Sequence, residues 1–274
     1  MSESQEKRAW SGILRWAWLL LPLLLILLMI RAWSPQRGLL RRSGTWERIQ
    51  REGVLRVGMD ASYPPFEWID ERGKFVGYDV DLARELAQRW DVEPQFVNVH
   101  FDGLYDALQT EKIDLIISAL PYDRTKTQDL LYSDPYFNAG QVLVAPRGNI
   151  SIQSVEDLDG KRVGVELGAR AHQLLRQLAR DRGVTAEIVT GRRPGEVFSL
   201  LGEGDVEALI CDRVTAYDRM EGEEMRIVEP PLTSAPFVIA ARSDSGTLIR
   251  KVDEALDVWQ ESGFLVDLEQ RWLR

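Results

Sequence analysis

The stretch GVLRVGMDASYPPFEWIDERGKFVGYDVDLARELA, residues 53–87, decides the fold. Val54–Met59 has the pattern of a buried strand, and apolar residues recur at helical spacing through residues 78–90. Between them, residues 60–68 hold two prolines and three aromatic residues at the carboxyl end of the strand, where open α/β sheets bind ligands. This composition suits a stiffened loop that clamps a small ligand, and it equally suits a turn that covers the core with aromatic rings.

Strand and helix patterns alternate through the rest of the chain. Besides residues 54–59, strands are expected at 94–99, 113–118, 141–146, 162–166, 186–189, 207–211 and 237–242. The nearly continuous apolar run of 113–118 is typical of a buried parallel strand. Helical patterns lie between these segments, and one of them, 169–182, ends at Gly183. Two consecutive α/β cycles predict two doubly wound lobes.

The formal charge of −9 over 274 residues is the sum of two unlike parts. The first 44 residues hold 7 lysines and arginines against 2 carboxylates, a net +5, which leaves −14 for the remainder. An acidic body has no surplus of positive charge to neutralise phosphates, which argues against general nucleic-acid binding.

Few residues are available for metal or thiol chemistry. Cys211 is the one cysteine, which excludes an internal disulfide, and two histidines argue against a zinc centre with several imidazoles. We therefore predict no metal and no cofactor. We expect Cys211 to be a small apolar residue of a strand, His100 to lie at a strand end and His172 on a helix surface.

Trp16–Ile30 form an uncharged apolar run of 15 residues near the N-terminus. That length suits a bilayer anchor or the core of a cleavable signal peptide. Tryptophans at both ends of the run, and the lack of a small-residue cleavage pattern at residues 32–34, favour an uncleaved anchor helix. Basic residues flank the run on both sides, so the positive-inside rule leaves the orientation open.

The quoted stretch resembles the opening of the extracellular solute-binding proteins of family 3, the periplasmic polar amino-acid-binding proteins of ABC importers. Further stretches agree with the family in order: FDGLYDAL, KIDLIISAL, YSDPYF, DLDGKRVGVELG and VEALICDR. The resemblance implies a two-lobed, type II periplasmic-binding-protein-like α/β fold, in which two hinge crossings join lobes that close on a ligand. The implied division is an anchor or signal segment with a linker at 1–44, lobe 1 at 45–138 and 236–274, and lobe 2 at 139–235.

The resemblance also implies ligand residues on both lobes. In lobe 1 these are Asp60 and Tyr63 on the first ligand loop, Phe101 as an aromatic wall, and Ser118, Ala119 and Leu120 as sources of backbone and hydroxyl groups. In lobe 2, Asp212 matches the carboxylate that holds the ligand's α-ammonium by a charge-assisted hydrogen bond. The alternative for Asp212 is a helix cap after the strand. We expect Asp212→Ala to abolish ligand-induced thermal stabilisation and to leave the apo fold intact.

The sequence departs from the family pattern where the ligand's carboxylate would bind. Lys126 takes the place of the usual arginine and lacks its planar fork, while Arg124 lies two residues away. Arg170 replaces a usual hydroxyl residue and would stand at a helix N-terminus, which favours an anion. A solvated surface arginine, or an ion pair with Glu166, is the alternative for Arg170. Which of the three cations binds the carboxylate stays open.

The resemblance implies an extracytoplasmic substrate-binding protein of an ABC transporter and no enzyme. It would capture a small polar ligand, an amino acid or a related carboxylate, by lobe closure and deliver it to a permease and its ATPase. The expected location is the cell membrane, or the periplasm or medium if the segment is cleaved. One alternative is a cyclohexadienyl dehydratase-like enzyme, whose general acid is missing from residues 168–172. The other is a sensing module with a separate signalling partner. Ligand identity and oligomeric state are left open.

Overall fold

The computed structural model describes residues 44–220 and 224–273, and from Thr45 onward the chain forms one compact unit. The apolar run Trp16–Ile30, and with it the predicted anchor helix, lies outside the described residues. In the described ranges, none of the helices combines the length and the apolar content needed to cross a membrane.

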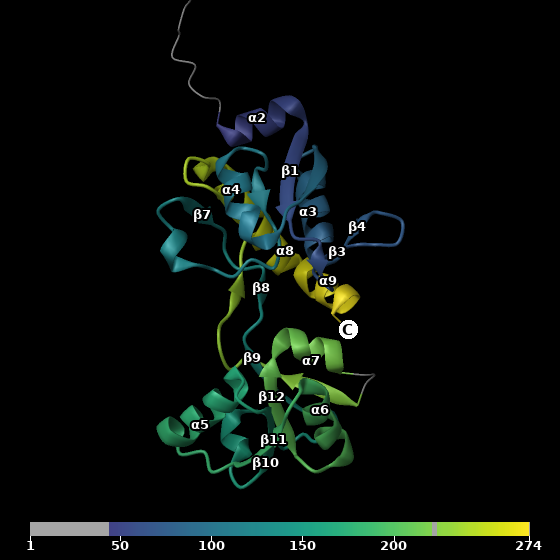
Figure 1. Cartoon of the computed structure of the whole chain (residues 1–274), viewed down its shortest axis with the longest axis vertical. Helices are drawn as coiled ribbons and strands as arrows, with labels where there is room; N and C mark the ends of the chain where they lie inside the picture. The colour runs from purple at the N-terminus through teal and green to yellow at the C-terminus, as the bar shows by residue number, and fades with distance from the viewer. Residues whose placement is uncertain (1–43, 221–223, 274) are drawn as a thin grey trace, which may run out of the picture. The chain divides into compact units, whose positions relative to one another are not determined.

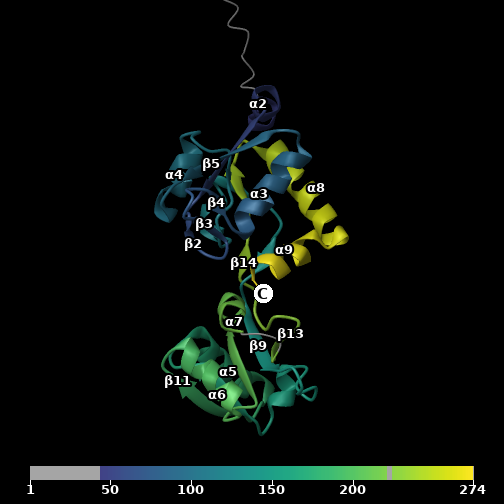
Figure 2. The ribbon, with the colours of Figure 1, turned by 90° about the vertical axis from the view of Figure 1, so that its right-hand side faces the viewer.

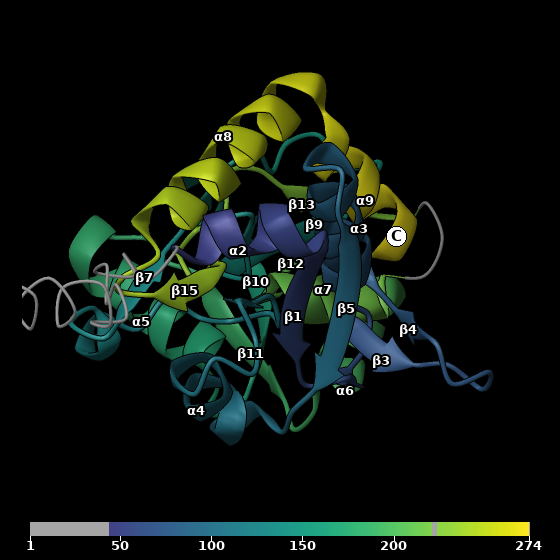
Figure 3. The same cartoon turned by 90° about the horizontal axis from the view of Figure 1, so that it is seen from above.

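The first sheet has the strand order β5-β1-β6-β15-β7. Its strands are β1 (Val54–Met59), β5 (Glu93–Asn98), β6 (Leu115–Ile116), β7 (Leu130–Tyr132) and β15 (Ala240–Arg242). β1 pairs in parallel with β5 and β6, whereas β15 runs antiparallel to β6 and β7. The helices of this part are α2 (Thr45–Glu52), α3 (Tyr78–Arg89), α4 (Leu104–Gln109), α8 (Gly246–Ser262) and α9 (Phe264–Trp272). Figure 3 shows β1 beside β5, with α8 and α4 toward opposite sides.

The second sheet has the order β11-β10-β12-β9-β13. Its strands are β9 (Gln141–Pro146), β10 (Arg162–Glu166), β11 (Glu187–Gly191), β12 (Ala208–Asp212) and β13 (Met225–Val228). β10 pairs in parallel with β11 and β12, and β9 runs antiparallel to β12 and β13. Its helices are α5 (Arg170–Arg182), α6 (Pro194–Glu203) and α7 (Arg213–Arg219).

Successive residues of the central strands explain why helices cover both faces of each sheet. Leu115 and Ile117 are buried in the core that includes α3 and α8, whereas Ile116 is buried with residues of α4. In the second sheet Ile210 packs with residues of α5, and Leu209 packs with residues of α6. Because side chains alternate across a strand, an unbroken apolar run requires apolar cover on both faces. The predicted pair of doubly wound sheets is confirmed.

Two crossings connect the sheets, as Figures 1 and 2 show. The chain leaves β7 through β8 (Phe137–Asn138) toward β9, and it returns from β13 through β14 (Pro236–Phe237) toward β15. β8 and β14 pair in an antiparallel manner. A Cβ atom added at Gly140 would lie 1.8 Å from the carbonyl oxygen of Thr233, so the close approach of the crossings requires glycine there. The expected two connections between the lobes are confirmed.

The lobe boundaries themselves stay a prediction. Below, lobe 1 denotes residues 45–138 and 236–273, and lobe 2 denotes residues 139–235.

Two expected strands are shorter in the structure. The segment 113–118 pairs with β1 only at Leu115 and Ile116. Side chains add to the backbone hydrogen bonds on either side of this pairing: the carboxylate of Asp114 accepts the Arg56 N–H at 2.9 Å, and the Ser118 hydroxyl accepts the Asp60 N–H at 3.0 Å. The segment 237–242 is divided between β14 in the crossing and β15 in the first sheet. Sequence periodicity does not show that β14 pairs with β8 in the crossing while β15 pairs with β6 and β7 in the first sheet.

The loop 60–68 forms part of a small antiparallel sheet of β2 (Ser62–Tyr63), β3 (Glu67–Ile69) and β4 (Phe75–Val76). Phe66 is fully buried, and its ring centroid lies 5.2 Å from that of Phe137 and 5.3 Å from that of Phe237, one on each crossing. Tyr63, by contrast, keeps 44% of its surface exposed. Phe66 therefore covers the core, whereas Tyr63 is left accessible and a ligand-clamping role for it stays a prediction.

Candidate functional site

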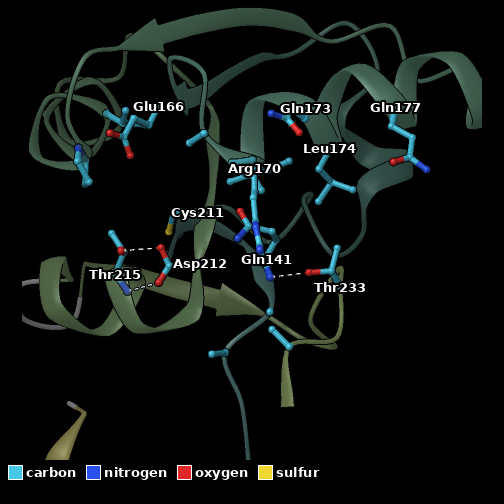
Figure 4. Close-up of a pocket in the computed structure, with 18 of the residues that line it drawn as sticks. Gln141, Glu166, Arg170, Gln173, Leu174, Gln177, Cys211, Asp212, Thr215 and Thr233 are labelled. Atoms are coloured by element: carbon cyan, nitrogen blue, oxygen red, sulfur yellow. Dashed lines mark hydrogen bonds between the residues drawn. The ribbon is translucent and has the colours of Figure 1, made fainter. Parts of the chain in front are cut away.

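A cavity of about 540 Å³ opens in lobe 2 (Figure 4). Its wall combines the carboxyl ends of β10 and β12, the first turn of α5, the start of β9 and the crossing residues 233–235. Parallel strands end at one edge of a sheet, so β10 and β12 bring their following residues to the same place. The polar side chains that line the cavity include those of Gln141, Glu166, Arg170, Asp212, Thr215 and Thr233.

Asp212 lies at the end of β12 and caps the N-terminus of α7. Its Oδ1 accepts the Thr215 N–H at 2.8 Å, and its Oδ2 accepts the Thr215 hydroxyl at 2.7 Å. The helix cap proposed as an alternative is therefore present. An ionised carboxylate has about four acceptor positions, so two remain after these bonds. Asp212 also lines the cavity, so capping and ligand binding are compatible.

Arg170 is the first residue of α5, and its side chain is exposed toward the cavity. In Figure 4 it is directed toward Gln141 and Thr233, while Glu166 lies apart. Among the residues that the structure describes, its guanidinium has no hydrogen-bond or ion-pair partner, so the alternative pair with Glu166 is not formed. A cation without a partner at a helix N-terminus provides a strong anion-binding potential.

The loop before α5 is held by His172. This side chain is buried, and its Nδ1 accepts the Gly168 N–H at 3.2 Å. The expectation of a helix-surface histidine is therefore wrong, because the first turn of α5 folds this side chain back against the loop. His100 is exposed, with its Nδ1 3.9 Å from a carboxylate oxygen of Asp102.

Cys211 lies on β12 beside Asp212 and lines the cavity. Burial raises the pKa of its thiol well above the usual value, and the charge of Asp212 adds to the shift. The thiol therefore stays protonated at neutral pH and is a weak nucleophile.

In lobe 1, three residues predicted separately form one hydrogen-bonded chain. The Asp60 N–H donates to the Ser118 hydroxyl at 3.0 Å, and Asp60 Oδ2 accepts the Phe101 N–H at 2.8 Å. Asp60 Oδ1 accepts the Ser62 hydroxyl at 2.7 Å. The loop after β1, the end of β6 and the start of α4 are thereby held together, which places Asp60, Phe101 and Ser118 at one edge of the first sheet.

Residues 118–120, the lobe 1 ligand segment, are more enclosed than the sequence indicated. Ser118 is buried, and its hydroxyl already bonds Glu67 and Asp60. The Ala119 N–H donates to Asp79, and the Leu120 carbonyl accepts the Val238 N–H at 2.9 Å. These hydroxyl and backbone groups are engaged within the protein. A ligand-contacting role for the segment stays a prediction that depends on its remaining groups.

Tyr63 and Phe101 present aromatic surface at the same edge, with 44% and 37% of their area exposed. The Tyr63 ring stacks on Phe66 with centroids 5.8 Å apart. Burial raises the pKa of the Tyr63 hydroxyl, and the negative charge of Asp212 raises it further.

The two other candidate cations lie elsewhere in lobe 1. Arg124 and Lys126 belong to a short 3₁₀ helix, Arg124–Lys126, which Asp123 caps through the Thr125 N–H. The Lys126 ammonium lies 5.4 Å from the centroid of the Tyr105 ring, a cation–π arrangement. Arg170 is therefore the one of the three that lines the lobe 2 cavity together with Asp212.

Sequence reasoning missed Gln141, Thr215 and Thr233. Thr215 had a local signal, because an aspartate followed three residues later by a hydroxyl residue favours a helix start. Gln141 had none, since it reaches the site through its antiparallel register opposite Asp212. Thr233 lies on the return crossing, and its hydroxyl accepts the Gln141 N–H at 2.8 Å. In the described ranges, histidine, cysteine and carboxylate side chains nowhere gather in threes that could bind a metal ion.

An ion-pair cluster ties lobe 2 to lobe 1 beside the site. Arg213 follows Asp212, and its guanidinium lies 2.8 Å from Glu229 and 3.2 Å from Glu269 on α9. The Tyr217 hydroxyl also donates to Glu269 at 3.0 Å. Because Asp212 caps the helix that begins at Arg213, these contacts couple the position of Asp212 to lobe 1.

Comparisons with known proteins identify the family of the chain. The model of the bacterial extracellular solute-binding proteins, family 3, matches residues 55–274. The L-cystine-binding protein TcyJ of Escherichia coli K12 is 27% identical over 232 residues, which cover 84% of this chain and 86% of that protein. A solved ancestral cationic amino acid solute-binding protein is 32% identical, with a TM-score of 0.60, and covers 84% of this chain and 100% of the other.

A solved ancestral cyclohexadienyl dehydratase has the higher TM-score of 0.75 at 24% identity, over 84% of this chain and 96% of that chain. At that identity the likeness shows the fold alone.

The match of the family model to residues 55–274 confirms the predicted family resemblance.

Proposed function

Because the chain belongs to the bacterial extracellular solute-binding proteins of family 3, we propose that it binds an amino acid for an ABC transporter. The related L-cystine-binding protein and the ancestral cationic amino acid binder support an amino acid as the ligand class. The partners would be a membrane permease and its ATPase.

The observation that carries this proposal is that Asp212 and Arg170, which have opposite charges, line the same cavity. The carboxylate of Asp212 offers two free acceptor positions to an ammonium group, and the unpartnered Arg170 guanidinium offers a planar donor fork to a carboxylate. Charge-assisted hydrogen bonds of this kind are about twice as strong as neutral ones. An α-amino acid carries both groups on one carbon, which suits two opposite charges in one cavity.

Ligand capture would proceed by closure of the lobes. Tyr63 and Phe101 supply exposed aromatic surface from lobe 1, while Arg170 and Asp212 supply charge from lobe 2. A ligand that contacts both lobes binds the closed state better than the open one, so it shifts the equilibrium by that difference in affinity. The two crossings at 137–138 and 236–237 are the natural hinge.

The proposal is tested by thermal shift and calorimetry over a panel of amino acids, cystine, matching amines and dicarboxylates. For the best ligand, Arg170→Gln removes a hydrogen bond to a charged group, about 1.5–3 kcal/mol, and should weaken binding about 10–100-fold. The amine that lacks the carboxylate should bind both proteins equally. Arg176→Gln, on an exposed position of the same helix outside the cavity, is the matched control. If no member of the panel stabilises the protein, the proposed function is wrong.

We further propose that the protein has no catalytic activity. The fold is shared with a dehydratase ancestor, and Glu166 gives the cavity a carboxyl group besides Asp212. However, the loop 168–172 presents Arg170 and the buried His172, whose Nδ1 is already bonded, and supplies no acid. Turnover of prephenate or arogenate by the purified protein would contradict this assignment.

Membrane attachment through Trp16–Ile30 is a separate part of the proposal. Its support is the uncharged run with tryptophans at both ends. Fractionation of cells that express the full chain tests it: the protein should stay with the membrane after a high-salt wash. Release into the periplasmic fraction would show cleavage instead. A sensing role through a separate partner remains the alternative if no permease binds the liganded protein.

A further inference from the structure

Two carboxyl groups lie side by side in the interior of lobe 1, beneath the lobe 1 ligand segment. Glu67 on β3 is 1% exposed, and Asp79 in the first turn of α3 is 0% exposed. Within residues 44–220 and 224–273, neither forms an ion pair. The equally buried Asp114, by contrast, has its charge compensated by ion pairs with Arg48 and Arg56. A buried carboxyl pair without a counter-cation needs another explanation.

The hydrogen bonds of Glu67 and Asp79 account for two of their four oxygens. Glu67 Oε1 accepts the Ser118 hydroxyl at 2.7 Å. Asp79 Oδ2 accepts the Ala119 N–H at 2.5 Å and the Tyr136 hydroxyl at 2.9 Å. Glu67 Oε2 and Asp79 Oδ1 are buried and have no hydrogen-bond donor among the described residues, and each carboxyl group lies close enough to shift the pKa of the other. Ionised carboxylates are acceptors only, so a hydrogen bond between the two groups requires one proton.

The surroundings assign that proton to Glu67. Burial raises the pKa of both carboxyls, and the charge of Asp79 raises the pKa of Glu67 further. The donors Ala119 and Tyr136 favour the ionised form of Asp79. The other titratable groups that face the pair are Asp60, whose charge adds to the shift of Glu67, and Tyr78 and Tyr136, whose hydroxyls burial keeps protonated.

The pair supports the predicted ligand residues of lobe 1. Ala119 has φ of 40°, in the left-handed region that a side chain disfavours, and its N–H is held by Asp79. Ser118 bridges Glu67 to the Asp60 N–H, and Asp60 in turn accepts the Phe101 N–H. We propose that Glu67 and Asp79 share one proton and act as positioning residues that hold Asp60, Ser118 and Ala119 in place for the ligand.

The positioning role rests on the proposed function, but the shared proton can be tested without any ligand. Glutamate in the unfolded chain ionises near pH 4.3, whereas Glu67 keeps its proton in the folded state at neutral pH. Unfolding therefore releases a proton, and one such proton raises the unfolding equilibrium constant tenfold per pH unit. Glu67→Gln carries its N–H at every pH and should lose this component.

The first experiment measures urea unfolding between pH 7.5 and 9.0 on the full chain, where Asp79 is ionised and Glu67 keeps its proton. The unfolding constant of the wild type should rise tenfold per pH unit relative to that of Glu67→Gln. Glu85→Gln, which removes one partly exposed carboxylate from the same helix as Asp79, should follow the wild type. Parallel curves for the wild type and Glu67→Gln would overturn the shared proton.

The second experiment follows hydrogen exchange at the Ala119 N–H. In Glu67→Gln the side-chain oxygen can accept from Ser118 while the amide N–H donates to Asp79, so protection should exceed that of Glu67→Ala by at least tenfold. In the double variant Glu67→Gln/Asp79→Asn, two NH₂ groups face each other once both oxygens accept their donors. Protection should then fall to the level of Glu67→Ala. A double variant as protected as Glu67→Gln would overturn the arrangement.

Ligand affinity separates positioning from the proposed function. With the best amino acid of the panel, Glu67→Ala should weaken binding at least tenfold, and Glu67→Gln should recover most of the loss. If Glu67→Ala does not fold, the same comparison is made between Glu67→Gln and the double variant. Lost Ala119 protection with unchanged affinity would overturn the positioning role. If the wild type binds no amino acid, the proposed function fails, while the ligand-free measurements still decide whether the proton is shared.

Discussion

Replacing Asp212 by asparagine and, separately, by alanine distinguishes the two roles of its carboxylate. The apo fold of Asp212→Ala is still expected to form, but with lower stability, because Asp212 caps α7 through the Thr215 N–H and hydroxyl. Asparagine is as good an N-cap as aspartate, whereas alanine costs about 1 kcal/mol. In a chain of this size, 1 kcal/mol corresponds to about 2–4 °C in Tm. We expect Asp212→Ala to lower the apo Tm by that amount and Asp212→Asn to leave it nearly unchanged.

The effect on ligand binding is expected to be the same for both variants, since both substitutions remove the charge. Losing a hydrogen bond to a charged group costs about 1.5–3 kcal/mol, or about 10–100-fold in Kd. Ligand at about 100 times Kd stabilises the wild type by about 2.7 kcal/mol, and a 100-fold weaker variant would lose nearly all of that shift. Both variants should therefore show little ligand-induced stabilisation.

The assay is thermal unfolding with and without ligand, together with calorimetric titration. Asp123→Ala is the matched control, because Asp123 caps a 3₁₀ helix through the N–H and hydroxyl of Thr125 outside the lobe 2 cavity. It should leave the ligand-induced shift unchanged. Wild-type affinity in Asp212→Asn would refute the role of the charge, and an unchanged apo Tm in Asp212→Ala would refute the cap.

Four further substitutions test the packing around the site. Gly140→Ala places a Cβ atom against the Thr233 carbonyl and should destabilise the protein by at least about 1 kcal/mol in urea unfolding; wild-type stability would show that the crossings are not closely packed. Phe66→Ala removes a fully buried ring and should cost about 3–5 kcal/mol by the same measurement, and a cost below about 1 kcal/mol would contradict its place in the core. Arg213→Ala and Glu269→Ala should show a coupling of about 1 kcal/mol in a double-mutant cycle, whereas strictly additive effects would mean that their ion pair does not tie the lobes.

Local patterns were sufficient to predict β1 and α3. β1 and α3 appear at Val54–Met59 and Tyr78–Arg89, close to the bounds expected from residues 53–87, because strand and helix periodicities are properties of neighbouring residues. The loop between them was harder to predict, since its composition is the same whether a ring faces the core or the solvent. Phe66 is buried between the crossings and Tyr63 is exposed, and only the position of β8 and β14 separates them.

The site residues divide in the same way. The place of Asp212 after a strand, and of Arg170 at a helix start, could be predicted because both follow from the local order of elements. The separation of Arg170 from Lys126 could not, because a cation's neighbours depend on which strands share a sheet edge. Likewise, the sequence indicated that Ser118 had a free hydroxyl, whereas in the fold this hydroxyl donates a hydrogen bond to Glu67.

The sequence by itself determined the family, the alternation of strands and helices, and the charged residues available for a ligand. Tertiary structure decided which of those charged groups are free and which already form hydrogen bonds or ion pairs within the protein. Gln141 meets Asp212 through an antiparallel register, and Glu67 meets Asp79 through the packing of β3 against α3. These contacts depend on register and burial, which many distant residues set together. A buried carboxyl also changes its protonation with its surroundings, so its chemistry cannot be assigned before its neighbours are known.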